Sequence, residues 1–348
     1  MSARPNLQDS MKSTWRRQDK SQWTFWHKIL DSIDAHHVEL DKKVPVHQKD
    51  EKIPYIPDWN AHRWILIYTG IPLSLHELYV RWRGSNFGPI IAYFFYYNAS
   101  RLTTIREIRS LRTLGHKYGF LDGDQHERDG VPDSAVQKTL TSVILAGTIR
   151  PLLMVYLAYT IARTPSAMNY FLLPLQIGIY GIVLDFWFYW YHRLMHEVDG
   201  LWKFHRRHHL TKHPTPLLAI YADHEQEFFD IAGIPLITFF SMKMLGFPMG
   251  FYEWYFCQQY VTFAEIAGHS GLRLHAAVPN PLTFLLRRFD AELVIEDHDL
   301  HHRRGWKGSY NYGKQTRLWD RIFGTSGTRI ESVENMVDYG TSVSIPLY

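Results

Sequence analysis

Cysteine is almost absent from this chain, and its scarcity limits the sites that the chain can form. Cys257 is the single cysteine among 348 residues, so the chain can form no internal disulfide and no metal site built from cysteines. The first residues, MSARPNLQDS, contain no apolar stretch of the kind that a signal peptide needs. We therefore expect no cleaved leader.

The chain also lacks a strong charge of either sign. Its net charge is only +4, and its basic residues alternate with apolar stretches, which favours anionic lipid headgroups over nucleic acid as partners. Aromatic residues make up 15% of the chain and hydrophobic residues 46%, whereas the mean hydropathy is −0.25. These values indicate a protein that lies partly in a membrane and partly outside it.

Apolar stretches recur along the chain, but several are interrupted. A helix needs about 20 apolar residues to cross a bilayer. Residues 88–98 are too short to cross alone, so we expect one end of a longer helix or a re-entrant segment. Arg150 lies inside the third stretch, and we explain this charge by a kink at Pro151 and a re-entrant path rather than by a functional role. The last stretch divides near Gly246, where we expect a helical hairpin. We predict about four transmembrane helices. The stretches are residues 64–80, 88–98, 139–163, 169–191 and 231–262.

Polar segments surround the first of these stretches. Residues 1–60 form an expected cytosolic arm whose three tryptophans, Trp15, Trp23 and Trp26, rest either on the bilayer or on the rest of the protein. The basic residues between Arg101 and Lys117 indicate a cytosolic loop under the positive-inside rule.

Histidine is concentrated in three motifs of the second half. Twelve of the 20 histidines lie in the last 157 residues, and eight of these twelve occupy one HxxxH and two HxxHH motifs. On a helix, residues three and four apart share a face, so each motif presents its imidazoles together. The eight residues are His192, His196, His205, His208, His209, His298, His301 and His302.

Imidazole binds iron, zinc, copper and nickel well, and eight imidazoles are too many for one tetrahedral zinc. The motifs therefore predict two metals. His269 is a ninth candidate because it follows an apolar stretch, with Glu265 one turn before it. His213 is disfavoured by Pro214, while His224 and His275 stay open as ligands, neighbours of ligands or surface residues. Carboxylates often orient ligand histidines, and five are placed to do so: Asp185, Asp223, Glu225, Asp297 and Asp299.

A site with two irons at the mouth of a membrane cavity suggests oxygen activation, because iron is redox-active and zinc is not. Two other functions stay open. A membrane zinc hydrolase would need HExxH, but Gly200 stands where the second histidine belongs. A histidine-rich metal transporter would carry its histidines inside the spans. We also expect the aromatic run at residues 186–191, and the residues near Tyr255, to line a slot for a substrate that enters from the bilayer.

The motifs HRLMH, HRRHH and DHDLHH, followed by GSYNYGKQTRLWDRIFGT, resemble the fatty acid hydroxylase (sterol desaturase) superfamily. The resemblance covers roughly residues 140–325 and includes the HSG at His269. One departure is AIYADHEQE, where Glu225 and Gln226 replace the family's Pro-Leu after His224. The resemblance assigns the metal ligands to His192, His196, His205, His208, His209, His269, His298, His301 and His302.

The resemblance implies an all-α membrane bundle under a cytosolic histidine-rich cap in the endoplasmic reticulum. It implies two Fe ions, O₂, and electrons from cytochrome b5 and its NAD(P)H reductase; the chain has no haem-binding His-Pro-Gly-Gly of its own. The expected enzyme is a non-haem di-iron monooxygenase or desaturase of a sterol, sphingolipid, fatty chain or related lipid. We divide the chain into an arm with the first membrane segments (1–137), a catalytic domain (138–328) and a tail (329–348).

Overall fold

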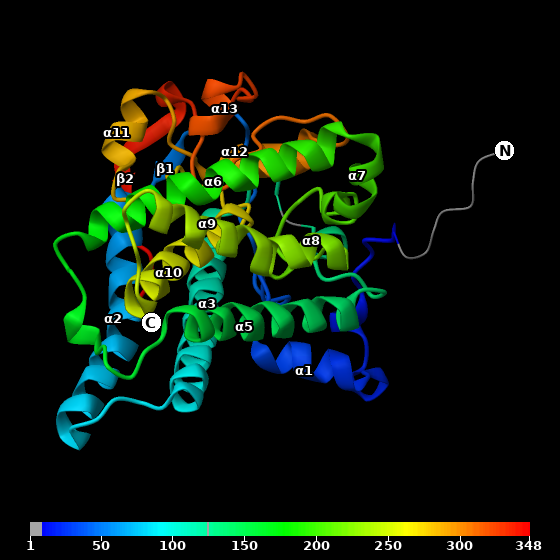
Figure 1. The fold of residues 1–348 in the computed structure, drawn as a ribbon. Helices are drawn as coiled ribbons and strands as arrows, with labels where there is room; N and C mark the ends of the chain where they lie inside the picture. Colours follow the sequence, from blue (N-terminus) through cyan, green and yellow to red (C-terminus); the bar gives the residue numbers. More distant parts are fainter. Residues whose placement is uncertain (1–8, 124) are drawn as a thin grey trace.

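The structure, a computed structural model, describes residues 9–123 and 125–348 and is predominantly helical. Six helices form its body (Figure 1). They are α2 (Asp58–Arg83), α3 (Pro89–Tyr118), α5 (Val136–Ala158), α6 (Leu173–Glu197), α9 (Ile234–Met244) and α10 (Phe251–Gly268). Helix α10 lies at the centre of this body, since 15 of its 18 residues are buried and it packs on α2, α3, α5 and α6.

The turns of three helical hairpins meet at one end of the body. These turns join α2 to α3, α5 to α6 and α9 to α10. Asn86 in the first turn donates to the carbonyl of Arg163 in the second at 2.7 Å, and Tyr252 at the start of α10 donates to the same carbonyl at 3.0 Å. Tyr159 donates back to the carbonyl of Phe87 at 2.9 Å. Buried polar groups need such partners, so these bonds hold the hairpins together where they turn.

Helices α7 and α8 lie at the opposite end, where α6 ends (Figure 1). The chain returns there in α12 after crossing the body in α9 and α10, whereas α11 lies near the start of α6 and α13 packs on its middle. All three histidine motifs lie at this end. The short helices are α1 (Phe25–Ile33), α4 (His126–Asp129), α7 (Asp199–His205), α8 (His224–Phe228), α11 (Thr283–Arg288), α12 (Ile295–Arg304) and α13 (Leu318–Ile322).

The fold is predominantly helical, as expected, with one small pair of strands in addition. Two short strands, β1 (Ile53–Tyr55) and β2 (Val337–Ser342), pair in parallel with Ile53 opposite Val337. The pair fixes the C-terminal segment to the N-terminal arm. The segment continues along α2 and α3, where the carbonyl of Pro346 accepts hydrogen bonds from Trp64 and Ser110.

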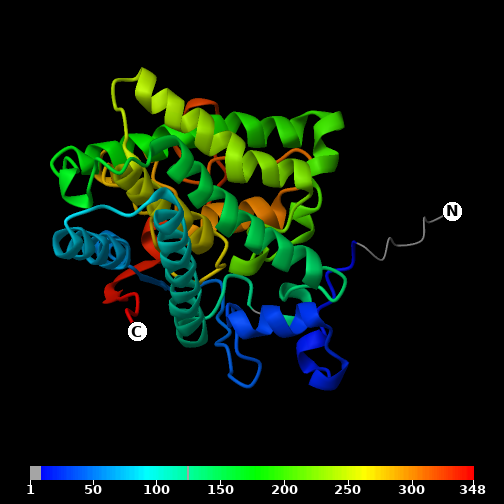
Figure 2. The ribbon, with the colours of Figure 1, turned by 60° about the horizontal axis from the view of Figure 1, so that its bottom comes forward.

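The N-terminal arm packs on the rest of the protein, as one of the two open interpretations of its tryptophans expected. Trp15 and Trp23 are buried, and the Trp15 indole donates to the carbonyl of Val131 at 3.0 Å. Helix α1 packs along α5, and Figure 2 shows the arm at the end of α5 farthest from the chain's C-terminus. Burial of two indoles rules out the bilayer surface as the resting place of these two side chains.

The basic run between Arg101 and Lys117 is helical and does not form a loop, while its cytosolic location stays a prediction. It forms the second half of α3, whose first half is the short apolar stretch at residues 89–98. Arg112 is buried and pairs with Asp34 of the arm at 2.6 Å. Arg112 therefore attaches the arm to the body, a role that the charge pattern of the sequence did not predict.

Among the described residues, one helix is long and apolar enough to cross a membrane by length and composition, namely α5. It continues through Pro151 as a single helix. The predicted break in the last apolar stretch is confirmed, because α9 and α10 are separate helices. The expectation of about four spans stays a prediction.

Candidate metal centre

The nine histidines that the sequence singled out come together in two adjacent groups. Each is at most 6% exposed. In each group every residue offers one ring nitrogen within 4.8 Å of the others. The first group is His192, His196, His205, His209 and His301, and the second is His208, His269, His298 and His302.

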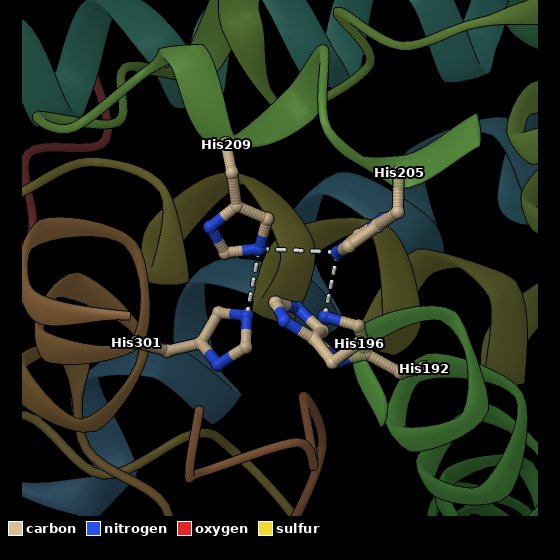
Figure 3. A group of neighbouring side chains, drawn as sticks. All are labelled: His192, His196, His205, His209 and His301. Atoms are coloured by element: carbon tan, nitrogen blue, oxygen red, sulfur yellow. Dashed lines mark hydrogen bonds between the residues drawn. The ribbon is translucent and has the colours of Figure 1, made fainter. Parts of the chain in front are cut away.

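The first group joins four elements around one point (Figure 3). His192 and His196 extend from one face of α6, His205 ends α7, His209 lies in the short 3-10 helix His208–Leu210, and His301 comes from α12. The Nε2 atoms form a chain of close contacts: His192 to His205 at 3.0 Å, His205 to His209 at 3.1 Å, and His209 to His301 at 3.0 Å. A metal about 2.1 Å from two nitrogens at a right angle would separate them by about 3.0 Å.

The outer ring nitrogens of this group determine its protonation. The Nδ1 atoms of His192, His196 and His301 lie 2.7–2.8 Å from the carbonyls of Tyr312, Trp306 and Tyr310. A carbonyl only accepts, so each Nδ1 carries the hydrogen and each Nε2 presents a lone pair inward.

The close contact between the Nε2 atoms of His192 and His205 brings two hydrogen-bond acceptors together. His205 Nδ1 lies 2.9 Å from the amide oxygen of Gln226, so its Nε2 is also an acceptor. Two acceptors 3.0 Å apart repel each other unless a cation lies between them. The group is therefore suited to hold a metal ion.

In the second group, too, backbone carbonyls bind outer ring nitrogens. His269 Nδ1 lies 2.6 Å from the carbonyl of Glu265, and His302 Nδ1 lies 2.9 Å from the carbonyl of Thr211. The Nε2 atoms of His269 and His298 are 2.9 Å apart. Rings from both groups touch, since His209 stacks on His302 with ring centroids 4.8 Å apart. Two cations could thus be held side by side.

Burial lowers the pKa of these imidazoles, which favours the neutral form that binds metals. It holds the pKa of His205, His208, His301 and His302 well below 6.5, first through desolvation and then through neighbouring imidazoles. Desolvation also lowers the pKa of His269 to about 4. At neutral pH the set therefore needs no deprotonation before a cation binds.

These shifts predict how the metal-free protein responds to acid. Below pH 6.5 the unfolded chain binds protons on these histidines while the folded chain does not, so the free energy of unfolding should fall as pH falls from 6.5 toward 4. Thermal unfolding of chelator-treated protein at pH 7.5, 6 and 5 measures this. Equal midpoints at all three values would contradict the assigned protonation states.

The five carboxylates were expected to accept the outer ring N–H groups of the histidines, and this expectation is wrong, because in the described part of the chain none of them bonds directly to one of the nine rings. Backbone carbonyls and one amide take that position. Asp297 and Asp299 bind Arg329 and Arg303, Asp223 binds Arg207, and Glu225 is exposed.

Asp185 has a different structural use. It is fully buried on α6, where its carboxylate accepts the backbone N–H groups of Lys314, Gln315 and Thr316 at 2.8, 2.9 and 3.1 Å. It also accepts the Thr316 hydroxyl at 2.7 Å. The loop that it holds begins at Tyr312, whose carbonyl binds His192. Asp185 therefore orients a histidine through a loop.

The segment that departs from the family pattern places His224 at the surface and Gln226 in the interior. His224 is exposed, lies outside both groups and binds Glu227 at 3.0 Å, so its open role is settled as a surface one. Gln226 is buried, and its amide oxygen is the partner of His205. His213 and His275 also lie outside both groups.

Replacing Gln226 by leucine should weaken metal binding by about 10–100-fold, because outer partners fix the ring orientation and basicity of a ligand histidine. Competition with a chelator of known affinity measures the change. Glu225→Gln is the control, since this neighbour is exposed. Equal metal affinities for Gln226→Leu and the control would show that Gln226 does not orient His205 for metal binding.

A buried charge network lies beside the second group. Glu265 accepts from Arg150 at 3.0 Å and pairs with Lys314 at 2.9 Å, and its own backbone carbonyl binds His269. The sequence explained Arg150 by a kink, but its partner is this carboxylate. The expected aromatic slot stays a prediction. Phe188 lies against His192 and beneath the Lys314 ammonium, which is 3.8 Å from its ring centroid.

The chain is similar to characterised proteins over most of its length. It is 43% identical to the fatty acid hydroxylase vlmA of Lecanicillium sp over 309 residues, which cover 83% of each chain. The chain belongs to the fatty acid hydroxylase family. The family model, described as fatty acid hydroxylase, matches residues 177–325 and spans all nine histidines.

Two further relatives of this fatty acid hydroxylase family member come from Arabidopsis thaliana. Methylsterol monooxygenase 1-3 is 34% identical, over 48% of this chain and 52% of its own length. Sphinganine C4-monooxygenase 2 is 29% identical, over 58% of this chain and 74% of its own. No solved structure matches the chain significantly. The relatives support an oxygenase that acts on lipids.

Proposed function

We propose that this chain is a membrane-bound, O₂-dependent hydroxylase that holds two iron ions and oxidises a C–H bond in the aliphatic chain of a lipid. The observation that carries this proposal is the pair of buried imidazole groups, and in the first of them the Nε2 atoms of His192 and His205 face each other at 3.0 Å with no hydrogen between them. The proposed ligands are His192, His196, His205, His208, His209, His269, His298, His301 and His302.

Iron suits the proposed chemistry better than zinc. The first group offers five imidazoles, one more than a tetrahedral zinc takes. Oxidising an unactivated C–H bond also needs a redox-active metal, which zinc is not.

The bound irons and O₂ would supply the oxidant, with one oxygen atom entering the C–H bond and the other leaving as water after uptake of two external electrons and two protons. The chain's own residues hold and shield that chemistry. Tyr312, Trp306 and Tyr310 fix three rings through their carbonyls, and Asp185 fixes the loop that carries the first of them. Burial of all nine rings excludes water.

The outer faces of the helices support a membrane location. Large apolar side chains are exposed along α2, α3, α5 and α9, and so extensive an apolar surface is rare on a soluble monomer. Examples are Leu75, Leu78, Trp82, Ile90, Phe94, Tyr156, Phe240 and Met244. We propose a multi-pass protein of the endoplasmic reticulum with its histidine-bearing end in the cytosol, where Arg206, Arg207 and Arg304 flank the groups.

The electron source and domain limits are part of the same proposal. Cytochrome b5 and its NAD(P)H reductase would deliver electrons at the cytosolic end. Residues 138–328 would form the catalytic domain, with 1–137 and 329–348 packed against it. The fatty acid hydroxylase named among the relatives supports a fatty chain as substrate. Desaturation starts from the same hydrogen abstraction and remains the second outcome.

Two other functions receive less support. A zinc hydrolase requires a second histidine that Gly200 replaces, and a transporter requires histidines spread along a path rather than gathered in two closed groups. Neither explains membership in a family of lipid hydroxylases.

The test is to incubate the purified protein with Fe(II), O₂, a reducing system and a panel of fatty acyl, sphingoid and sterol lipids. Mass spectrometry should detect a product 16 mass units heavier, with the added oxygen derived from ¹⁸O₂. Hydrolysed lipids without oxygen incorporation would contradict the proposal and support the zinc hydrolase.

A further inference from the structure

An apolar cavity of about 160 Å³ lies beside the proposed metal centre, between α3, α5 and α10. Helices α3 and α5 cross there, as both ribbon views show (Figures 1 and 2). Its apolar wall includes Ile105, Val143, Met154 and Ile266. Gly147 of α5 leaves room in the wall, because a side chain there would meet only Arg101 at an ordinary 3.9 Å.

The size of the cavity decides what shape can enter. An apolar cavity of about 150 Å³ accommodates a ligand the size of benzene, which has six carbons. A segment of unbranched chain fits this volume, whereas the four fused rings of a sterol exceed it. The cavity therefore selects a linear aliphatic segment.

Two buried polar groups in the wall have unused hydrogen-bonding capacity. Gln258 is 4% exposed; its amide nitrogen donates to Tyr180 at 2.7 Å, while its amide oxygen has no partner in the described part of the chain. The Nε of Arg150 also has no partner among the described residues. A ligand group that both donates and accepts would satisfy the two together.

The charges around Arg150 are balanced, so the wall at the Arg150 end offers no surplus charge to an anion, and the other arginine that lines the cavity, Arg101, is exposed. Arg150 and Lys314 both pair with Glu265, and Arg150 also donates to the backbone carbonyl of Asp230 at 3.1 Å, whose carboxyl adds a second acidic group. A carboxylate entering the cavity would add an unpaired buried charge, which is costly. A neutral hydroxyl avoids that cost.

Hydrogen bonds connect this wall to both histidine groups. Glu265 carries the carbonyl that binds His269 of the second group. Asp230 accepts from Gln226, and Gln226 binds His205 of the first group. The cavity is thus adjacent to the proposed oxidation site.

We propose that this cavity binds an unbranched aliphatic chain bearing a neutral hydroxyl-like group, held between the Arg150 Nε and the Gln258 amide oxygen, and so sets which lipid is oxidised. The role in selecting the oxidised lipid rests on the proposed hydroxylase function, whereas binding of the chain can be measured without turnover.

The test measures equilibrium binding of tritiated tetradecan-1-ol to the full-length protein as isolated, in nanodiscs under nitrogen, with tetradecanoate and cholesterol as competitors. Wild type should bind the alcohol saturably, tetradecanoate should compete more weakly, and cholesterol should not compete. Gly147→Phe should reduce alcohol binding at least tenfold. This change replaces a glycine inside a helix, which favours the helix.

Ile144→Phe is the matched control, because it enlarges an exposed side chain on the same helix. Gln258→Leu should weaken alcohol binding about fivefold, in keeping with one lost hydrogen bond. Unchanged binding by Gly147→Phe, or competition by cholesterol, would overturn the chain assignment, and tighter binding of tetradecanoate would overturn the neutral group. Intact binding without lipid oxidation would instead count against the proposed function alone.

Discussion

Alanine at His205, His208, His301 or His302 should lower lipid oxidation by at least about 100-fold. Removing a residue that only orients a metal ligand already costs up to about 100-fold in activity, and removing the ligand itself should cost at least as much. Each replacement removes one inward lone pair from a group whose members lie within 4.8 Å of one another. Metal content should fall with activity, measured by elemental analysis of the purified variants. Membrane insertion should persist, because the apolar helices determine it.

His224→Ala is the matched control for these four variants, since this histidine lies at the same end of the molecule but is exposed and outside both groups. It should retain activity and metal. More than a tenth of wild-type activity in two of the four variants would contradict the ligand assignment.

Asp185→Ala should destabilise the protein by roughly 3–5 kcal/mol, because it strands several buried donors that each cost about 1–3 kcal/mol when unpaired. Three of these donors are the consecutive N–H groups of residues 314–316. The thermal midpoint in detergent should fall by roughly 5–10 °C. Metal affinity should fall as well, since the released loop includes the carbonyl partner of His192.

Asp223→Ala removes a carboxylate of the same type from a partly exposed pair with Arg207 and serves as the control. Such pairs contribute about 0–1 kcal/mol, so its midpoint should change little. Equal midpoints for the two variants would show that Asp185 does not hold the loop.

The histidine groups were predictable because the spacing of the histidines in the sequence determines which of them share a helix face. The HxxxH and HxxHH motifs predict imidazoles on shared faces, and the structure places all eight of these residues, together with His269, in the two groups. His269 depended on its place after an apolar stretch rather than on a motif. Helical periodicity also places Asp185 and His192, which are about two turns apart, on one face of α6, and both are buried.

The partners of the histidines were not predictable from residue types. Most are backbone carbonyls, such as those of Tyr312 and Trp306, and every residue has a carbonyl whatever its side chain. Expecting carboxylates was therefore the wrong inference. Gln226 did leave a signal, because it stands where the family pattern departs, but that departure was connected to His224 instead.

Long-range pairing explains the remaining differences. Charge patterning assigned the basic run of α3 to a loop, whereas Arg112 pairs with Asp34, 78 residues away. Arg150 found Glu265 at a separation of 115 residues, and β1 found β2 near the other end of the chain. Such pairings depend on how the helices cross, which periodicity along one segment does not specify.

The central claim, two irons held by nitrogen in adjacent groups, is tested most directly by metal analysis combined with iron X-ray absorption on protein expressed with iron. The account predicts two metal ions per chain, nitrogen neighbours at about 2.0–2.3 Å, and a second iron in the next shell. One metal per chain with four ligands and no iron neighbour would contradict it.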